Sequence, residues 1–116
     1  MIENFGVGID IVEISRFKKL LYTKKESFYK KIFNPIEIEY CLKFSDPYRH
    51  FAAKFAIKEA VKKSISKDMN LLDIITSYKD KKPIVMINQK LNYKFLVSVS
   101  HEKSYTIAIV ISEAIV

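Results

Sequence analysis

Residues 46–65 read DPYRHFAAKFAIKEAVKKSI and predict the longest helix of the chain. The pair Asp46-Pro47 is a typical helix start, because an aspartate side chain caps the first turn and proline is favoured at the first helical position. After this pair, Tyr48, Phe51 and Phe55 recur at the spacing of one helix face. We expect the helix to run to about the end of this stretch.

Shorter elements are predicted before this helix. Alternating apolar residues predict a strand over residues 5–12. Helical spacing predicts helices over residues 13–21 and 26–32. The pair Asn34-Pro35, with Glu37 in the first turn, predicts another helix start.

Strands are predicted after the long helix, where Ile, Val, Phe and Tyr are frequent. They cover residues 72–78, 83–87, 95–100 and 105–111. One strand, then helices, then strands is the order of an α+β domain in which an antiparallel sheet packs on the long helix. The length of 116 residues, without a Pro/Gly/Ser-rich stretch, predicts one domain over residues 1–116.

The formal net charge of +7 favours an anionic partner. That partner is a nucleic acid, a phosphorylated small molecule, an acidic protein or an anionic membrane surface, and charge alone does not choose among these. The single cysteine, Cys41, excludes an intrachain disulfide and is expected to be a buried, unreactive thiol. Because apolar runs are shorter than the roughly 18 residues that span a bilayer, we expect no transmembrane helix.

The first residues enter a strand-like run at once, without the basic and apolar regions of a signal peptide. We therefore expect a cytoplasmic protein, or an organellar one if a transit segment has been removed.

Asp10 is unusual in the predicted first strand, because aspartate is disfavoured in strands. It shares a face with Gly6 and Gly8, whose missing Cβ atoms allow something to approach the backbone closely. Three explanations remain open for the Asp10 carboxylate: it is solvated at a strand end, hydrogen-bonded in a local turn, or bound to a cation.

Glu59 falls on the apolar stripe of the long helix, one turn after Phe55. The ordinary explanation is an ion pair along the helix with Lys62 or Lys63. Together with Asp10, however, Glu59 could form the small oxygen-ligand set that Mg²⁺ accepts when phosphates and waters supply its other ligands.

The same helix carries Lys54, Lys58, Lys62 and Lys63. This positive charge suits a metal-bound diphosphate, although a lysine-rich helix face is usually just solvated.

Three motifs stand in a fixed order along the chain. The first is Gly8-Ile9-Asp10-Ile11-Val12, with Arg16 six positions after the aspartate. The second is Lys54-Phe55-Ala56-Ile57-Lys58-Glu59-Ala60, with Lys63 four positions after the glutamate. The third is Ser100-His101-Glu102-Lys103-Ser104-Tyr105. In order and spacing they resemble the motifs of the holo-acyl-carrier-protein synthases, a family of 4′-phosphopantetheinyl transferases, and the resemblance spans essentially the whole chain.

The resemblance implies transfer of the 4′-phosphopantetheine arm of coenzyme A to a serine of an acidic acyl carrier protein, with release of adenosine 3′,5′-bisphosphate, in fatty acid biosynthesis. Asp10 and Glu59 would hold Mg²⁺ against the coenzyme A diphosphate. Glu59, or a water that it orients, would take the serine proton. Lys63 would stabilise or protonate the leaving phosphate. The implied catalytic residues are therefore Asp10, Glu59 and Lys63.

The resemblance also implies contacts with coenzyme A. Lys54, Lys58, Lys63 and His101 would contact its phosphates. For His101, a turn histidine hydrogen-bonded at a strand end is an equally good explanation.

The same resemblance implies that Arg16, Lys18 and Lys19 dock the carrier protein, where complementary charge speeds encounter. The ordinary alternative is a set of solvated residues on a surface helix. The fold implied is that of the 4′-phosphopantetheinyl transferases, as a homotrimer with coenzyme A between subunits and no nucleic acid or membrane partner.

Three positions depart from the family pattern. Lys54 stands where the family usually has arginine, which replaces a planar fork with a point charge. Residues 66–70 lack the glycine of a loop that approaches the substrate, and residues 80–83 lack the glycine of the hairpin, so a different turn type is predicted.

Two other functions compete with this interpretation. A small basic nucleic-acid-binding module would expose aromatic residues on a strand face. The patterns place most of Phe51, Phe55, Phe95 and Tyr105 toward the core instead. A metal-dependent nuclease or phosphatase would use the same acids with water as the nucleophile.

Overall fold

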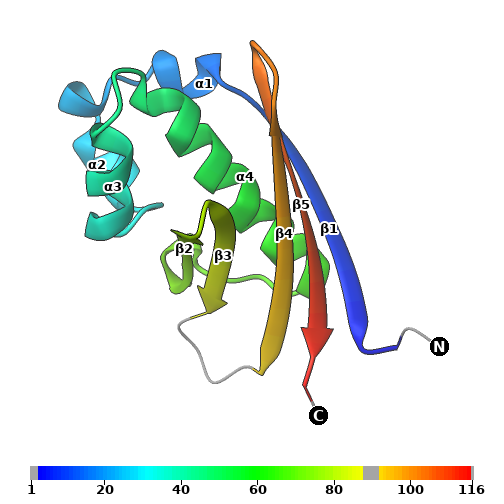
Figure 1. Cartoon of the computed structure of the whole chain (residues 1–116). Helices are drawn as coiled ribbons and strands as arrows, with labels where there is room; N and C mark the ends of the chain where they lie inside the picture. The colour runs from blue at the N-terminus through cyan, green and yellow to red at the C-terminus, as the bar shows by residue number, and fades with distance from the viewer. Residues whose placement is uncertain (1–2, 88–91, 116) are drawn as a thin grey trace.

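The computed structural model describes residues 3–87 and 92–115. A three-stranded antiparallel sheet carries the long helix α4 across one face, and the short helices gather at one end of α4 (Figure 1). The elements are β1 (Phe5–Glu13), α1 (Ser15–Lys18), η1 (Tyr22–Lys24), α2 (Glu26–Lys30), α3 (Pro35–Leu42), α4 (Pro47–Ile65), η2 (Leu71–Asp73), β2 (Ile74–Lys79), β3 (Lys82–Ile87), β4 (Tyr93–His101) and β5 (Tyr105–Ala114).

Both predicted cap and proline pairs start helices. The Asn34 side chain accepts from the backbone N–H of Glu37 at 2.9 Å, and the Glu37 side chain accepts from the backbone N–H of Asn34 at the same distance. This reciprocal arrangement fixes the start of α3. Asp46 accepts from the backbone N–H of Tyr48 at 3.3 Å, and α4 then runs to Ile65, as the spacing predicts.

The helix predicted over residues 13–21 is wrong in extent, because only Ser15–Lys18 are helical. Tertiary bonds hold the chain on both sides of it. The backbone N–H of Ile14 donates to the carbonyl of Ser104 at 2.9 Å, and the Tyr29 hydroxyl donates to the carbonyl of Leu20 at 2.6 Å. The helix predicted over residues 26–32 likewise ends earlier, at Lys30.

The predicted strands form two sheets. In the larger one, β5 lies between β1 and β4, and Asp10 of β1 is opposite Ala108 of β5. The hairpin β2–β3 is a separate two-stranded sheet. Strand β2 starts two residues later than predicted, because Leu71–Asp73 form the short 3₁₀ helix η2.

The two faces of β1 have opposite environments. Gly6, Gly8, Asp10 and Val12 are turned toward α4, whereas the apolar residues between them are exposed. A Cβ atom on Gly8 would lie 1.9 Å from the carbonyl oxygen of Ala60, and one on Gly6 would lie 1.8 Å from that of Ser64. The glycines therefore allow the α4 backbone to lie directly against β1, which confirms the expected close approach.

The core lies between α4, the inner face of the sheet and the short helices. Its centre is an aromatic cluster in which Tyr29 and Phe51 have ring centroids 4.6 Å apart. Cys41 is fully buried, and burial raises the pKa of its thiol to about 12, which confirms an unreactive thiol. Tyr105 differs from its predicted place in the core, since 43% of it is exposed. Among the described residues, no helix is long and apolar enough to cross a membrane.

Candidate functional site

Asp10 and Lys63 form the centre of the candidate site. The Lys63 Nζ lies 3.0 Å from Oδ1 of Asp10 and 3.0 Å from the backbone oxygen of Ile9. The Asp10 side chain is 16% exposed and the Lys63 side chain is 55% exposed. In the structure, the Asp10 carboxylate is therefore paired with the ammonium group of Lys63.

Glu59 lies one helical turn before Lys63 on α4 and is half-buried. Residues four apart share a helix face, so Glu59 lies on the flank of α4 from which Lys63 reaches Asp10. The expected ion pair along the helix is wrong, because the two lysines pair elsewhere. Lys62 pairs with Asp68 at 3.4 Å, and Lys63 pairs with Asp10.

The donors at this site suit a hard divalent cation. Asp10 and Glu59 offer carboxylate oxygens, and the Asp10 carboxylate already binds a positive charge next to the Ile9 carbonyl. Within residues 3–87 and 92–115, no group of three or more His, Cys, Asp or Glu side chains could hold a metal ion. Mg²⁺ accepts one or two protein carboxylates when waters and substrate phosphates complete its shell, so the residues present fit that ion.

Lys58 is placed differently from what the resemblance implies. It is fully buried, and its Nζ lies 2.7 Å from Oε1 of Glu37, 2.7 Å from the Ile32 carbonyl and 3.1 Å from the Leu71 carbonyl. These three acceptors use all three N–H donors of the ammonium group. A phosphate contact would require this buried network to open, so we leave Lys58 out of the coenzyme A contacts.

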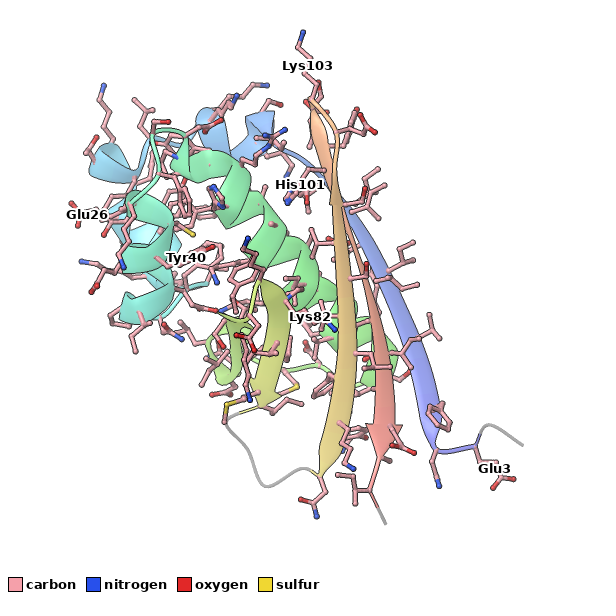
Figure 2. All side chains as sticks on the ribbon, in the orientation of Figure 1. Glu3, Glu26, Tyr40, Lys82, His101 and Lys103 are labelled. Atoms are coloured by element: carbon pink, nitrogen blue, oxygen red, sulfur yellow. The ribbon has the colours of Figure 1, made fainter. Side chains whose placement is uncertain are left out.

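Lys54 is buried beside Lys58 and also differs from the expected phosphate contact. Its Nζ donates to the hydroxyl of Thr76 at 3.0 Å and lies over the rings of Tyr40 and Tyr78, at 4.8 and 5.2 Å from their centroids. Figure 2 shows Tyr40 extending from α3 toward the β2–β3 hairpin. Burial lowers the pKa of Lys54 and also that of Lys58, whose shift the charge of Glu37 opposes. Both lysines therefore join α4 to neighbouring elements.

His101 ends β4, on the side of that strand turned toward α4 (Figure 2). Its turn is tied to α4, because a guanidinium N–H of Arg49 donates to the carbonyl of Glu102 at 3.3 Å. Burial lowers the pKa of His101, and the charge of Arg49 adds to this effect. Burial also lowers the pKa of His50, with a further contribution from His101.

His50 had no predicted role from the sequence. It stacks on Phe44 with ring centroids 3.7 Å apart, and it lies close enough to His101 for the charge of His101 to lower the pKa of His50. The available signal was weak, since His50 and Arg49 precede the second motif by one helical turn.

Arg16 of α1 and Lys19, which follows this helix, line an apolar groove. The Arg16 guanidinium lies 5.5 Å from the ring centroid of Phe55, and Lys18 pairs with Asp46 at 3.6 Å. A groove of about 400 Å³ opens beside them and is lined by Arg16, Phe17, Lys19, Leu20, Phe28, Ile32 and Phe55. Arg16 and Lys19 therefore present positive charge at the rim of an apolar depression.

The two departures that lack a glycine, at residues 66–70 and 80–83, include backbone with positive φ. Ser66 ends α4 with φ of 53°, in the left-handed region that glycine adopts most easily. Asp80 and Lys81 turn the β2–β3 hairpin with φ of 51° and 67°. Two successive positive values are those of a type I′ turn, which Asn-Gly and Asp-Gly pairs also favour. The predicted change of turn type is therefore wrong, and the same turn forms here without glycine.

Comparisons with known proteins find relatives over most of the chain. The family model described as the 4′-phosphopantetheinyl transferase superfamily matches residues 6–110. The chain is 41% identical to a holo-[acyl-carrier-protein] synthase of Thermodesulfovibrio yellowstonii, covering 91% of this chain and 96% of the relative. It is 39% identical to the synthase of Chlamydia trachomatis, covering 94% and 99%.

Solved structures show the same fold. A holo-(acyl-carrier-protein) synthase from Bacillus anthracis, in complex with CoA (3′,5′-ADP), gives a TM-score of 0.82 at 28% identity, covering 95% of this chain and 96% of that chain. A Helicobacter pylori holo-[acyl-carrier-protein] synthase in complex with coenzyme A gives a TM-score of 0.81 at 29% identity, covering 92% and 99%.

Proposed function

This chain belongs to the 4′-phosphopantetheinyl transferase superfamily, and we infer that it is a holo-[acyl-carrier-protein] synthase. It transfers the 4′-phosphopantetheine group of coenzyme A to a serine of apo acyl carrier protein. The agreement with synthases of this kind over nearly the whole chain carries the conclusion. The comparisons give no support to a nucleic-acid-binding module.

The transfer breaks the phosphoanhydride of coenzyme A and forms a phosphodiester between the pantetheine arm and the serine. A bond forms between the serine oxygen and the β-phosphorus of the coenzyme A diphosphate, and the bond from that phosphorus to the bridging oxygen breaks. Adenosine 3′,5′-bisphosphate leaves with the electron pair. Catalysis of such a step depends mainly on positioning and on stabilisation of the phosphoryl charge.

Asp10 and Glu59 would hold Mg²⁺ at this site. When bound, Mg²⁺ neutralises charge on the diphosphate. Glu59, directly or through a water that it orients, would accept the proton of the serine hydroxyl. Lys63 would donate hydrogen bonds to the leaving phosphate. Support for these roles comes from the Asp10–Lys63 contact and from the position of Glu59 one turn before Lys63.

Different parts of the chain would contact coenzyme A and the carrier protein. The resemblance favours His101 as a phosphate contact, and the guanidinium of Arg49 on α4 adds positive charge close to it. Arg16 and Lys19 would meet acidic residues of the carrier, whereas Lys18 is already paired with Asp46. We propose that the carrier serves fatty acid biosynthesis.

Association of chains is supported by the outer face of the larger sheet, and the resemblance favours a homotrimer. Large apolar side chains there are 37–71% exposed in the single chain: Phe5, Val7, Ile9, Ile11, Leu96, Ile109 and Ile111. A contiguous apolar patch on a sheet face marks an interaction surface. Sedimentation should therefore give three chains for the wild type and a smaller species for Ile9→Lys. Ile36→Lys, which changes an even more exposed isoleucine on α3, should leave the assembly intact.

The reaction class is tested by measuring, with chromatography, the release of adenosine 3′,5′-bisphosphate from coenzyme A. We expect release only with apo carrier protein, and none with a carrier whose acceptor serine is alanine. Release without any carrier would indicate hydrolysis by water and would contradict the transferase assignment. A chelator should stop the reaction and added Mg²⁺ should restore it.

A further inference from the structure

The Lys63 ammonium is paired with the Asp10 carboxylate, which would also be a ligand of the divalent cation. It lies 3.0 Å from Oδ1 of Asp10 and 3.0 Å from the Ile9 carbonyl oxygen. We propose that Lys63 is a resident counter-ion that neutralises Asp10 in the free enzyme, and that the arriving divalent cation displaces it. This inference rests on the proposed function, because it takes Asp10 as a metal ligand.

Two cations compete for one carboxylate here. An ammonium group and a divalent ion held within a few ångströms of each other repel strongly, and a metal at an oxygen distance of about 2.0–2.1 Å leaves little room for the ammonium group. Glu59, on the same flank of α4, provides the second carboxylate that the metal can use and that Lys63 does not pair with.

Lys63 is the member of the pair that can move. Its side chain is 55% exposed, whereas the Asp10 side chain is 16% exposed and is held on β1 against α4. A lysine side chain has a flexible four-carbon stem, so its ammonium group can move toward solvent without disturbing α4. Lys58 lies on the same helix, but its ammonium group is fully buried and bonded to three acceptors, so it has no such freedom.

Displacement sets an order for metal binding at Asp10 and for the contact between Lys63 and the diphosphate. Because the metal must break the Asp10–Lys63 pair in order to bind, its affinity for the free enzyme is lower than it would be without Lys63. The released ammonium group then lies next to the metal site, where a diphosphate brought by coenzyme A offers it a new anionic partner. Lys63 is thus directed to the phosphate only after the metal has taken Asp10.

Manganese binding in the absence of coenzyme A and carrier protein tests this without measuring activity. Free Mn²⁺ is followed by its electron paramagnetic resonance signal during titration of folded protein. We expect Lys63→Met to bind Mn²⁺ about threefold to fivefold more tightly than the wild type, the upper part of the range for a partly exposed ion pair. Lys63→Arg, which keeps the charge and can pair with Asp10, should show no tightening.

Lys62→Met is the matched control, because it removes the same charge from the adjacent residue, which pairs with Asp68 instead. We expect it to change Mn²⁺ affinity by less than about twofold, as for a general change in net charge. Equal tightening in Lys62→Met and Lys63→Met would overturn the displacement. Asp10→Asn distinguishes failure of the displacement from failure of the metal site. If Asp10→Asn weakens Mn²⁺ binding but Lys63→Met does not tighten it, only the displacement is overturned. If Asp10→Asn binds Mn²⁺ as the wild type does, the metal site itself is overturned.

Discussion

Replacing Lys58 with methionine should strongly destabilise the protein, because its ammonium group lies in the interior. Methionine keeps most of the side-chain length, so the main loss is the charge and its three hydrogen bonds. The change leaves the carboxylate of Glu37, which is 1% exposed, without its cation, and removes the donor to the Ile32 and Leu71 carbonyls. Removing one partner of a buried ion pair costs about 3–5 kcal/mol of the free energy of unfolding.

Lys63→Met is the matched comparison on the same helix. Its ion pair with Asp10 has a similar distance, 3.0 Å against 2.7 Å for Lys58 and Glu37, but the Lys63 side chain is 55% exposed. Exposed pairs contribute about 0–1 kcal/mol. The two variants therefore differ in burial and not in chemistry, and we expect the Lys58 change to cost several times more.

Urea unfolding followed by circular dichroism measures this difference, since the chain has no tryptophan for fluorescence. Protein concentration must be the same for all variants, because association adds to apparent stability. We expect the unfolding midpoint of Lys58→Met to fall by more than about 1 M urea. If that variant does not fold, the double variant Lys58→Met with Glu37→Gln should recover folding, since both charges are then removed. Midpoints that shift equally little in Lys58→Met and Lys63→Met would refute the reasoning.

Three further changes test the backbone and the histidines. Gly8→Ala should destabilise by about 3 kcal/mol, because its Cβ would lie 1.9 Å from the Ala60 carbonyl, and a wild-type melting temperature would contradict that packing. Ser66→Gly should stabilise by about 0.5 kcal/mol by relieving the positive φ at the end of α4, and a lower melting temperature would contradict this. The folded pKa values of His50 and His101 lie below the ordinary 6.5, so below pH 6.5 the unfolded chain binds more protons and stability falls as pH falls. The difference in melting temperature between about pH 7.5 and pH 5.5 should shrink in His50→Gln, and an unchanged difference would exclude His50 as a source.

Local chemistry made much of the fold predictable. The starts of α3 and α4 follow from Asn34-Pro35 and Asp46-Pro47, whose capping bonds involve residues two or three positions apart. Alternation likewise predicted the two faces of β1. The extent of α1 was missed because the ends of this helix depend on distant partners, among them Ser104 and the hydroxyl of Tyr29.

The candidate site was predictable only in part. Asp10 and Glu59 stood out because a carboxylate is unusual at their positions. The cation beside Asp10 comes from Lys63, which is 53 residues away, and no helical or strand period links the two. The burial of Lys58 depends on Glu37, 21 residues before it on another helix. The sequence does not distinguish a lysine that pairs inside the protein, such as Lys58, from one that faces solvent, such as Lys63. The predicted phosphate contacts therefore included both kinds of lysine.

Mass spectrometry of an apo acyl carrier protein tests the central claim most directly. The carrier is incubated with this protein, coenzyme A and Mg²⁺, and parallel reactions contain Asp10→Ala or Glu59→Ala. We expect the carrier to gain the mass of one phosphopantetheine group on its serine, and to gain it far more slowly with either variant, although both variants remain folded. Carriers that stay unmodified in the presence of folded wild-type protein would contradict the assignment as a holo-[acyl-carrier-protein] synthase.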